Sequence, residues 1–177
     1  MEELKVGEKV MAIDQNGRTV LSEVTMFLHK NTNTTSEHHL KLSTENGKTV
    51  TLTQLHLIWV ATDEQYIFAK DVQVGQLIAV YDACQDHLRR SRVTRIEELP
   101  KRGMYAPLTA VGTLLVNDVH VSCYASFQSH RVSQAVMWMW GKLSAHIDWL
   151  NNEQRDESGI LWFPRYLLSF ATALRIV

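Results

Sequence analysis

The chain has 177 residues, of which 45% are apolar, and this length and composition suit one domain with a packed core. The 18 basic and 19 acidic residues nearly cancel and form no basic patch, which argues against a nucleic-acid partner. Two cysteines, Cys84 and Cys123, are too few for a disulfide scaffold or a structural zinc site, so we expect no metal and no cofactor. The charged start Met1-Glu2-Glu3 is not a signal peptide, and no run reaches the roughly 18 apolar residues of a membrane-spanning helix.

Short segments that alternate or are rich in β-branched residues fill the first two thirds of the chain, which is an all-β pattern. The turn signals Asn16-Gly17 and Asn46-Gly47 tolerate positive φ and predict hairpins. Residues 31–37 and 82–90 are polar and are predicted as loops. The predicted strands are 4–13, 19–28, 39–43, 48–53, 57–60, 65–69, 77–81, 91–97, 113–116 and 119–126.

These segments contain an internal repeat, which predicts two similar halves at about 4–73 and 74–126. We expect the halves to be related by a pseudo-twofold axis within a β-domain of residues 1–126. The alternative is that similar turns have produced similar short segments independently. The matching pairs are 6–14 with 74–82, 22–25 with 91–94, and Gly47 and His56 with Gly112 and His120.

Thr53 and His56 stand at the point where a strand ends, three positions apart, and can aim at the same point. A hydroxyl that hydrogen-bonds a peptide and an imidazole that exchanges a proton are the groups that peptide-bond rearrangement needs. The other interpretation of the pair is a polar strand terminus without a catalytic role.

Residues 127–177 change to a helical period, with a polar break from 151 to 158 and Pro164 suited to the first turn of a second helix. Four of the five tryptophans lie in this region, Trp138 and Trp162 among them. The tail is predicted either to pack on the β-domain as a helical pair or to form a lipid or membrane interface.

Several motifs, in the same order, resemble the autoprocessing domain of hedgehog proteins. The most specific are Ala106-Pro107-Leu108-Thr109 and Ser122-Cys123-Tyr124-Ala125; the others are Ser22-Glu23-Val24 with Phe27, Thr53-x-x-His56, and Gly159-Ile160-x-Trp162-Phe163. The resemblance implies the all-β HINT fold of two subdomains, shared with inteins, followed by a helical sterol-recognition region. Trp138, Trp162 and Phe163 are then candidates for sterol contact.

The resemblance also implies an activity. In the family, a Cys at the start of the domain attacks the preceding carbonyl to give a thioester, and a sterol hydroxyl then releases a lipid-modified upstream product. By motif match, His56 would protonate or polarise the scissile amide nitrogen and Thr53 would hydrogen-bond the same peptide. Cys123 matches the second cysteine of the family, which can exchange with the nucleophile and assist folding.

The chain departs from the family pattern at two places. The nucleophilic Cys should lie before Leu4, and neither Cys84 nor Cys123 matches it, so the printed residues are expected to be inactive alone. His29 occupies the position of an Asp thought to activate the sterol hydroxyl. An imidazole can serve as that base near neutral pH, but His29 can equally be a structural residue at a strand end.

Two functions of different class follow from the sequence. The first is a self-cleaving peptidase and sterol transferase, covalently joined to an upstream signalling domain, with a sterol as second substrate and a membrane interface through its tail. The second is a non-catalytic protein that keeps the fold and binds sterol or membrane. An intein is disfavoured because His120 is followed by Val121 and not by Asn. The resemblance places such a protein in the secretory pathway, in the lumen of the endoplasmic reticulum, or outside the cell.

Overall fold

The computed structural model describes residues 2–125, without the side chains of residues 34–37 and 125. The described chain is built from strands and one short turn of 3-10 helix, Ala69–Asp71, so the all-β prediction is confirmed for this part. The predicted helical tail of residues 127–177, with Trp138, Trp162 and Phe163, lies outside it. The strands are β1 (Lys9–Ile13), β2 (Thr19–Thr44), β3 (Thr49–Thr53), β4 (His56–Val60), β5 (Gln65–Phe68), β6 (Leu77–Asp82), β7 (His87–Thr109), β8 (Thr113–Val116) and β9 (Val119–Ala125).

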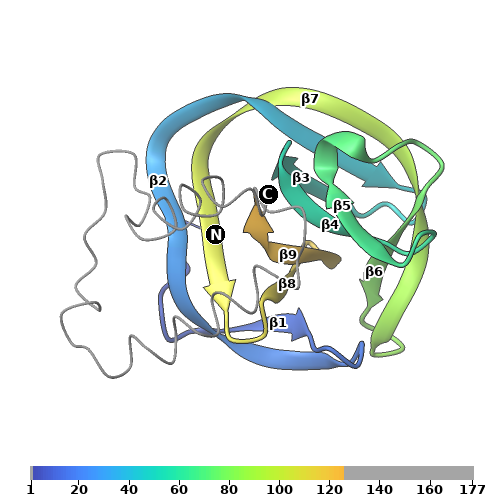
Figure 1. Cartoon of the computed structure of the whole chain (residues 1–177), viewed down its shortest axis with the longest axis horizontal. Coiled ribbons are helices and arrows are strands. Elements are labelled where there is room, and N and C mark those ends of the chain that lie inside the picture. Colours follow the sequence, from blue (N-terminus) through green and yellow to red (C-terminus); the bar gives the residue numbers. More distant parts are fainter. Residues whose placement is uncertain (1, 126–177) are drawn as a thin grey trace, which may run out of the picture.

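Two long strands, β2 and β7, curve around the other strands and pair with each other along most of their length (Figure 1). The predicted loop 31–37 is wrong, because these residues continue β2. Residues 87–90, predicted as loop, begin β7, and the Ala106-Pro107-Leu108-Thr109 motif ends it. The β2–β7 pairing tolerates the polar stretch because its register shifts at several places, one of them between Asn31 and Thr35.

The two Val-Gly segments of the repeat have the same backbone setting. The Gly7 amide donates to Val24 O at 2.9 Å, and the Gly75 amide donates to Val93 O at 2.8 Å. Both glycines have positive φ, +89° and +99°, which only glycine adopts readily. The similarity therefore lies in the fold and not merely in turn composition.

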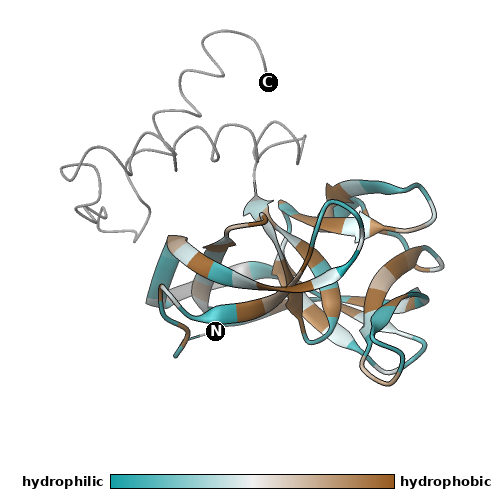
Figure 2. Ribbon diagram, turned by 90° about the horizontal axis from the view of Figure 1, so that it is seen from below, coloured by the Kyte–Doolittle hydropathy of each residue, from teal (hydrophilic) through white to brown (hydrophobic). Residues whose placement is uncertain are grey.

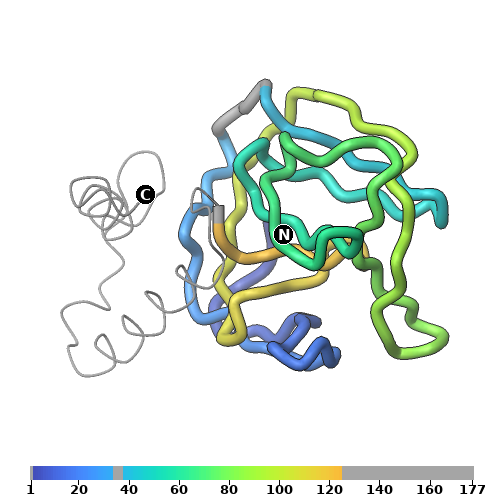
Figure 3. The backbone as a smooth tube through the Cα atoms, turned by 45° about the vertical axis from the view of Figure 1, so that its right-hand side comes forward, coloured from blue at the N-terminus to red at the C-terminus, as the bar shows by residue number. Residues whose placement is uncertain are grey.

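The pairing of β2 with β7 is also symmetric about its middle. Near one end the Ala110 amide donates to Glu23 O at 3.0 Å, and near the other end the Glu45 amide donates to Arg92 O at 2.9 Å. Exchanging the two halves of the sequence repeat turns each of these two hydrogen bonds into the other. Figure 3 shows the consequence, since the blue chain of the first half and the yellow-green chain of the second run side by side at two places. The backbone contacts of the repeat segments are thus matched in pairs, and the pseudo-twofold axis between the halves stays a prediction.

One core of buried aliphatic side chains from both halves lies between these strands. Hydrophobic and polar residues alternate along the strands (Figure 2), as expected where one face of a strand is buried. In β3, for example, Val50 and Leu52 are 1% and 5% exposed, while the three threonines that alternate with them are half-buried. Other core residues are Leu42, Ile58, Val60, Ile78, Val80, Val93, Val119 and Val121. Among residues 2–125, no helix has the length and apolar character that crossing a bilayer requires.

Candidate functional site

The predicted Thr53-x-x-His56 pair occupies the tight turn between β3 and β4. Thr53 is the last residue of β3, where it pairs with His39 of β2, and His56 is the first residue of β4. Gln54, the first of the two residues between them, is held by the rest of the fold. The Lys70 amide donates to Gln54 O at 3.0 Å, and the Gln54 side chain donates to a Glu98 oxygen at 3.1 Å. The turn therefore presents Thr53 and His56 on a fixed backbone.

The His56 ring bonds a carbonyl of the neighbouring strand β9, with Nε2 2.8 Å from Ser122 O. A carbonyl oxygen only accepts hydrogen bonds, so Nε2 carries the proton and Nδ1 of the neutral ring has the free lone pair. Desolvation by burial lowers the pKa of His56 below its ordinary value, and the bond to Ser122 opposes part of that change. The ring is therefore neutral near neutral pH and can accept a proton at Nδ1.

An irregularity in the β4–β9 pairing makes this bond possible. His56 pairs with Ala125 and Ile58 pairs with Val121, so two steps along β4 correspond to four along β9. Ser122 lies in the extra length of β9. Irregular pairing of this kind redirects backbone and side-chain groups and is frequent beside active sites. Here it directs a backbone carbonyl at the imidazole.

Cys123 follows Ser122 and is buried, with 1% of its surface exposed. Its sulfur lies 3.5 Å from the Thr109 hydroxyl, which donates to Thr113 O at 2.7 Å. Burial raises the pKa of Cys123 to about 11, although its hydrogen bonding with Thr109 acts in the opposite direction. Cys123 is therefore a protonated thiol at neutral pH, which is unfavourable for the predicted exchange with a nucleophile unless the site opens.

His29 lies on β2 opposite Ala106 of β7, a different strand pairing from that of His56. The next residue, Lys30, donates from Nζ to Leu4 O at 2.8 Å and lies 4.6 Å from the centroid of the Phe27 ring. This side of β2 therefore holds the first described residues of the chain. Nothing in the geometry tests His29 as a base, so its role stays a prediction.

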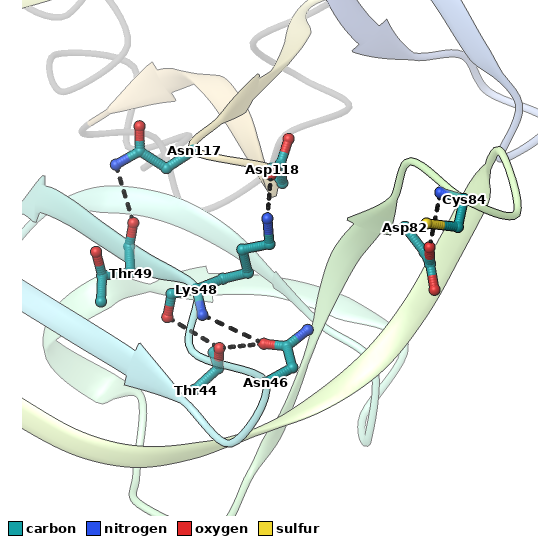
Figure 4. A network of polar contacts seen from close by, with 8 residues as sticks. All are labelled: Thr44, Asn46, Lys48, Thr49, Asp82, Cys84, Asn117 and Asp118. Atoms are coloured by element: carbon teal, nitrogen blue, oxygen red, sulfur yellow. Dashed lines mark hydrogen bonds and ion pairs between the residues drawn. The ribbon is translucent and has the colours of Figure 1, made fainter.

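Two contacts join the loop before β3 to the turn before β9 (Figure 4). Lys48 Nζ donates to Asp118 at 2.6 Å, and the Asn117 amide donates to Thr49 O at 3.0 Å. The Asp118 carboxylate raises the pKa of Lys48 through this bond. The contacts thus connect the strand that ends at Thr53 with the strand that carries Ser122 and Cys123.

The structure therefore brings the His56 ring and the Ser122 carbonyl together at the β4–β9 interface. Sequence reasoning missed Ser122 as the partner of His56, because any residue type can supply a carbonyl. It also missed Thr109, although Thr109 is part of a recognised motif. Among residues 2–125, no three His, Cys, Asp or Glu side chains are grouped in a way that could hold a metal ion.

Comparison with known proteins gives consistent results at three levels. A family model described as the Hint module matches residues 1–176. A "Protein hedgehog" of Drosophila pseudoobscura pseudoobscura is 30% identical over 185 residues, covering 94% of this chain and 38% of that protein. An "Indian hedgehog B protein" of Danio rerio is 30% identical over 189 residues, covering 98% of this chain and 44% of that protein. The chain thus spans about two fifths of the length of these relatives.

Solved structures of inteins have the same fold. An intein from a hyperthermophile matches with a TM-score of 0.56 at 19% identity, covering 64% of this chain and 70% of its own. A DnaB intein from Synechocystis sp. PCC 6803 matches with a TM-score of 0.54 at 17% identity, covering 67% and 79%. At these identities the likeness concerns the fold alone.

Proposed function

Because the chain belongs to the Hint module family, we propose that it is the autoprocessing domain of a hedgehog-like protein. It cleaves the peptide bond that joins it to an upstream signalling domain. The observation that carries this proposal is the His56 imidazole, fixed at a tight turn by the Ser122 carbonyl and neutral by virtue of its burial. A neutral imidazole with one nitrogen anchored and the other available is suited to moving a proton at a reacting peptide.

The first step is an N-to-S acyl shift at a cysteine on a segment that precedes Leu4 in the longer protein. Its sulfur attacks the preceding carbonyl carbon, and His56 Nδ1 takes the thiol proton. The tetrahedral intermediate then collapses, the C–N bond breaks, and His56 returns the proton to the departing amine. No oxidant or cofactor is needed. Thr53, at the other side of the same turn, is proposed to hydrogen-bond the scissile peptide.

The geometry modifies the role expected for His56 from the sequence. A lowered pKa leaves the His56 ring neutral near neutral pH, so at the outset Nδ1 holds no proton that it could give to the amide nitrogen. It must first act as a base toward the thiol and only then as an acid toward the amine. The anchored Nε2 keeps the same nitrogen, Nδ1, facing the reaction in both roles.

The second step is proposed by resemblance to hedgehog proteins. A sterol hydroxyl attacks the thioester and carries away the upstream domain, with His29 as the base and the tail, including Trp138, Trp162 and Phe163, as the sterol and membrane contact. Processing of this kind would take place in the secretory pathway, before an extracellular signal is released. Cys123 would serve this domain as a packed thiol and not as the nucleophile.

The test uses the longer protein, with the residues that precede Met1 in its gene. Dithiothreitol intercepts a thioester, so thiol-induced cleavage measured by mass spectrometry reports the first step, and cleavage with sterol reports both. His56→Ala should abolish both cleavages. His87→Ala is the matched control, because His87 is an exposed histidine that also bonds a backbone carbonyl, that of Gln85 at 3.1 Å. Thiol cleavage at an unchanged rate in His56→Ala would refute the proposal.

The same experiment tests the alternative, a HINT-fold protein that binds sterol or membrane without processing. A folded longer protein that is not cleaved with thiol or with sterol would support binding alone. His29→Ala separates the two steps, since it should slow sterol-induced cleavage and leave thiol-induced cleavage nearly intact. An unchanged sterol rate would make His29 a structural residue.

A further inference from the structure

Three rings from three different strands form a cluster beside the proposed site. Trp59 of β4 and Tyr66 of β5 meet edge to face with centroids 5.0 Å apart. Trp59 stacks on His120 of β9 at 6.3 Å, and Tyr66 meets His120 edge to face at 5.8 Å. Each ring thus contacts both of the others. Aromatic pairs with defined ring geometry contribute about 0.5–1.5 kcal/mol each beyond the area they bury, so the cluster joins the three strands.

The cluster contains a buried polar bond. Tyr66 Oη lies 3.0 Å from His120 Nε2, and His120 is 5% exposed. Partial burial raises the pKa of Tyr66, so the phenol stays protonated and can donate this bond. A buried imidazole stabilises a strand position only when such bonds are made, because an unmatched polar group is costly inside a protein.

The position of the cluster along β4 and β9 connects it with His56. Trp59 follows His56 by three residues on β4, and His120 precedes Ser122 by two residues on β9. The regular pair Ile58–Val121 separates the cluster from the stretch of β9 where pairing becomes irregular. On its other side β9 pairs regularly with β8, where Ser122 lies opposite Thr113. Toward β4 the regular pairing ends at Ile58–Val121, so the placement of β9 against β4 beyond that pair depends on the side chains that join the two strands just before it.

We propose that Tyr66 and His120 are positioning residues of the autoprocessing site. Through the bond between them, enclosed by Trp59, they hold β9 so that the Ser122 carbonyl keeps the His56 ring in its working orientation. This inference rests on the proposed function, because it assigns the pair a task at the His56 site. The pair itself contacts neither the scissile bond nor the nucleophile.

The test is made on the chain of residues 1–177 and needs no processing. Tyr66→Phe keeps all three rings and removes only the hydroxyl, and NMR of the histidine side chains then reports His56. We expect the His56 Nε2 proton to exchange with solvent on the order of tenfold faster, because its acceptor is less well held. We also expect the pKa of His56 to fall further below its ordinary value, because the Ser122 bond, which raises it, is weakened while the ring stays buried.

Tyr81→Phe is the matched control, because the Tyr81 hydroxyl also donates one hydrogen bond, to Asp86 at 2.8 Å, but in the hairpin between β6 and β7. It should leave the His56 signals unchanged. His120→Gln keeps a group that can bond the phenol and should retain most of the His56 behaviour, whereas His120→Leu should resemble Tyr66→Phe.

A purely structural role for the pair has a different outcome. Tyr66→Phe would then lower the melting temperature while the His56 proton exchange and titration in the folded protein stayed as in the parent chain, and this result would overturn the inference. If Tyr66→Phe failed to fold, the two His120 variants would take its place. Faster exchange of the His56 proton in His120→Leu than in His120→Gln would support the inference, and equal exchange would overturn it. Loss of processing in the longer protein with unchanged His56 signals would count against the pair and not against the proposed function.

Discussion

The Thr113 hydroxyl bonds both backbone groups of Ile13, accepting from its amide at 3.0 Å and donating to its carbonyl at 2.6 Å. The Asp14 amide bonds Arg18 O within the β1–β2 hairpin, so the alternation of an antiparallel ladder turns the groups of Ile13 away from β2. Both residues are buried. The Thr113 side chain of β8 thus makes the two hydrogen bonds that a neighbouring strand would otherwise make with Ile13. It also connects the second half of the chain to the first.

The first prediction follows from this contact. Thr113→Val preserves the shape of the side chain and leaves two buried backbone groups of Ile13 without the hydroxyl. Each unsatisfied group costs about 1–3 kcal/mol, so the free energy of unfolding should fall by about 2–6 kcal/mol. Urea unfolding followed by circular dichroism measures the change. Thr94→Val, which removes an exposed hydroxyl that donates to Ser43 O, is the control and should lose much less. Equal losses would contradict the account.

The second prediction concerns the thiol of Cys123. Its pKa rises from 9.0 to about 11 on folding, so the folded state holds the thiol proton more firmly than the unfolded state. The resulting stability is fully present below pH 9 and is lost as the pH rises from 9 to 11, by about 1.4 kcal/mol per unit at most. Urea unfolding at pH 8, 9 and 10 should show a weaker pH dependence for Cys123→Ala than for Cys84→Ala. Parallel curves for the two variants would show that Cys123 does not titrate as expected.

The third prediction concerns the Lys48–Asp118 pair. Both side chains are about two fifths exposed, at 43% and 41%, and exposed ion pairs contribute little to stability. A double-mutant cycle with Lys48→Met and Asp118→Asn should therefore give a small coupling, and 1 M NaCl should remove it. A large coupling that resisted salt would mean that the pair is shielded from solvent and holds the two halves together more strongly than its exposure indicates.

The sequence predicts the strands well where the pattern is local. Thr113–Val116 was predicted at its observed bounds, and the Gly47 turn between β2 and β3 has the expected positive φ of +79°. The continuity of β2 through residues 31–37 was not predictable, because it depends on pairing with β7, far along the chain. Polar residues on a paired and exposed ribbon have no alternation that would distinguish them from a loop.

The same distinction between local patterns and distant contacts applies to the candidate site. Thr53 and His56 carry a sequence signal because the proposed function requires their side chains. The partner that fixes His56 is a carbonyl, presented by irregular strand pairing that no single-residue pattern encodes. The sequence singled out His120 only by its repeat position, which matches that of His56, since its contacts with Trp59 and Tyr66 exist only in the folded sheet.

The last prediction tests the lowered pKa of His56 directly and uses only residues 1–177. Folding depresses this pKa below 6.5. At a pH between the pKa of the folded state and 6.5, the unfolded chain therefore binds a proton that the folded chain excludes. The contribution of the neutral ring is therefore fully present above pH 6.5 and is lost as the pH falls. His56→Gln keeps an amide that can donate to Ser122 O but cannot titrate. The difference in unfolding free energy between the parent chain and His56→Gln should be constant above pH 7 and should shrink steadily toward pH 5. His87→Gln controls for loss of an exposed histidine. A difference that stayed constant down to pH 5 would mean that the ring is not desolvated, and the base-first role proposed for His56 would lose its physical reason.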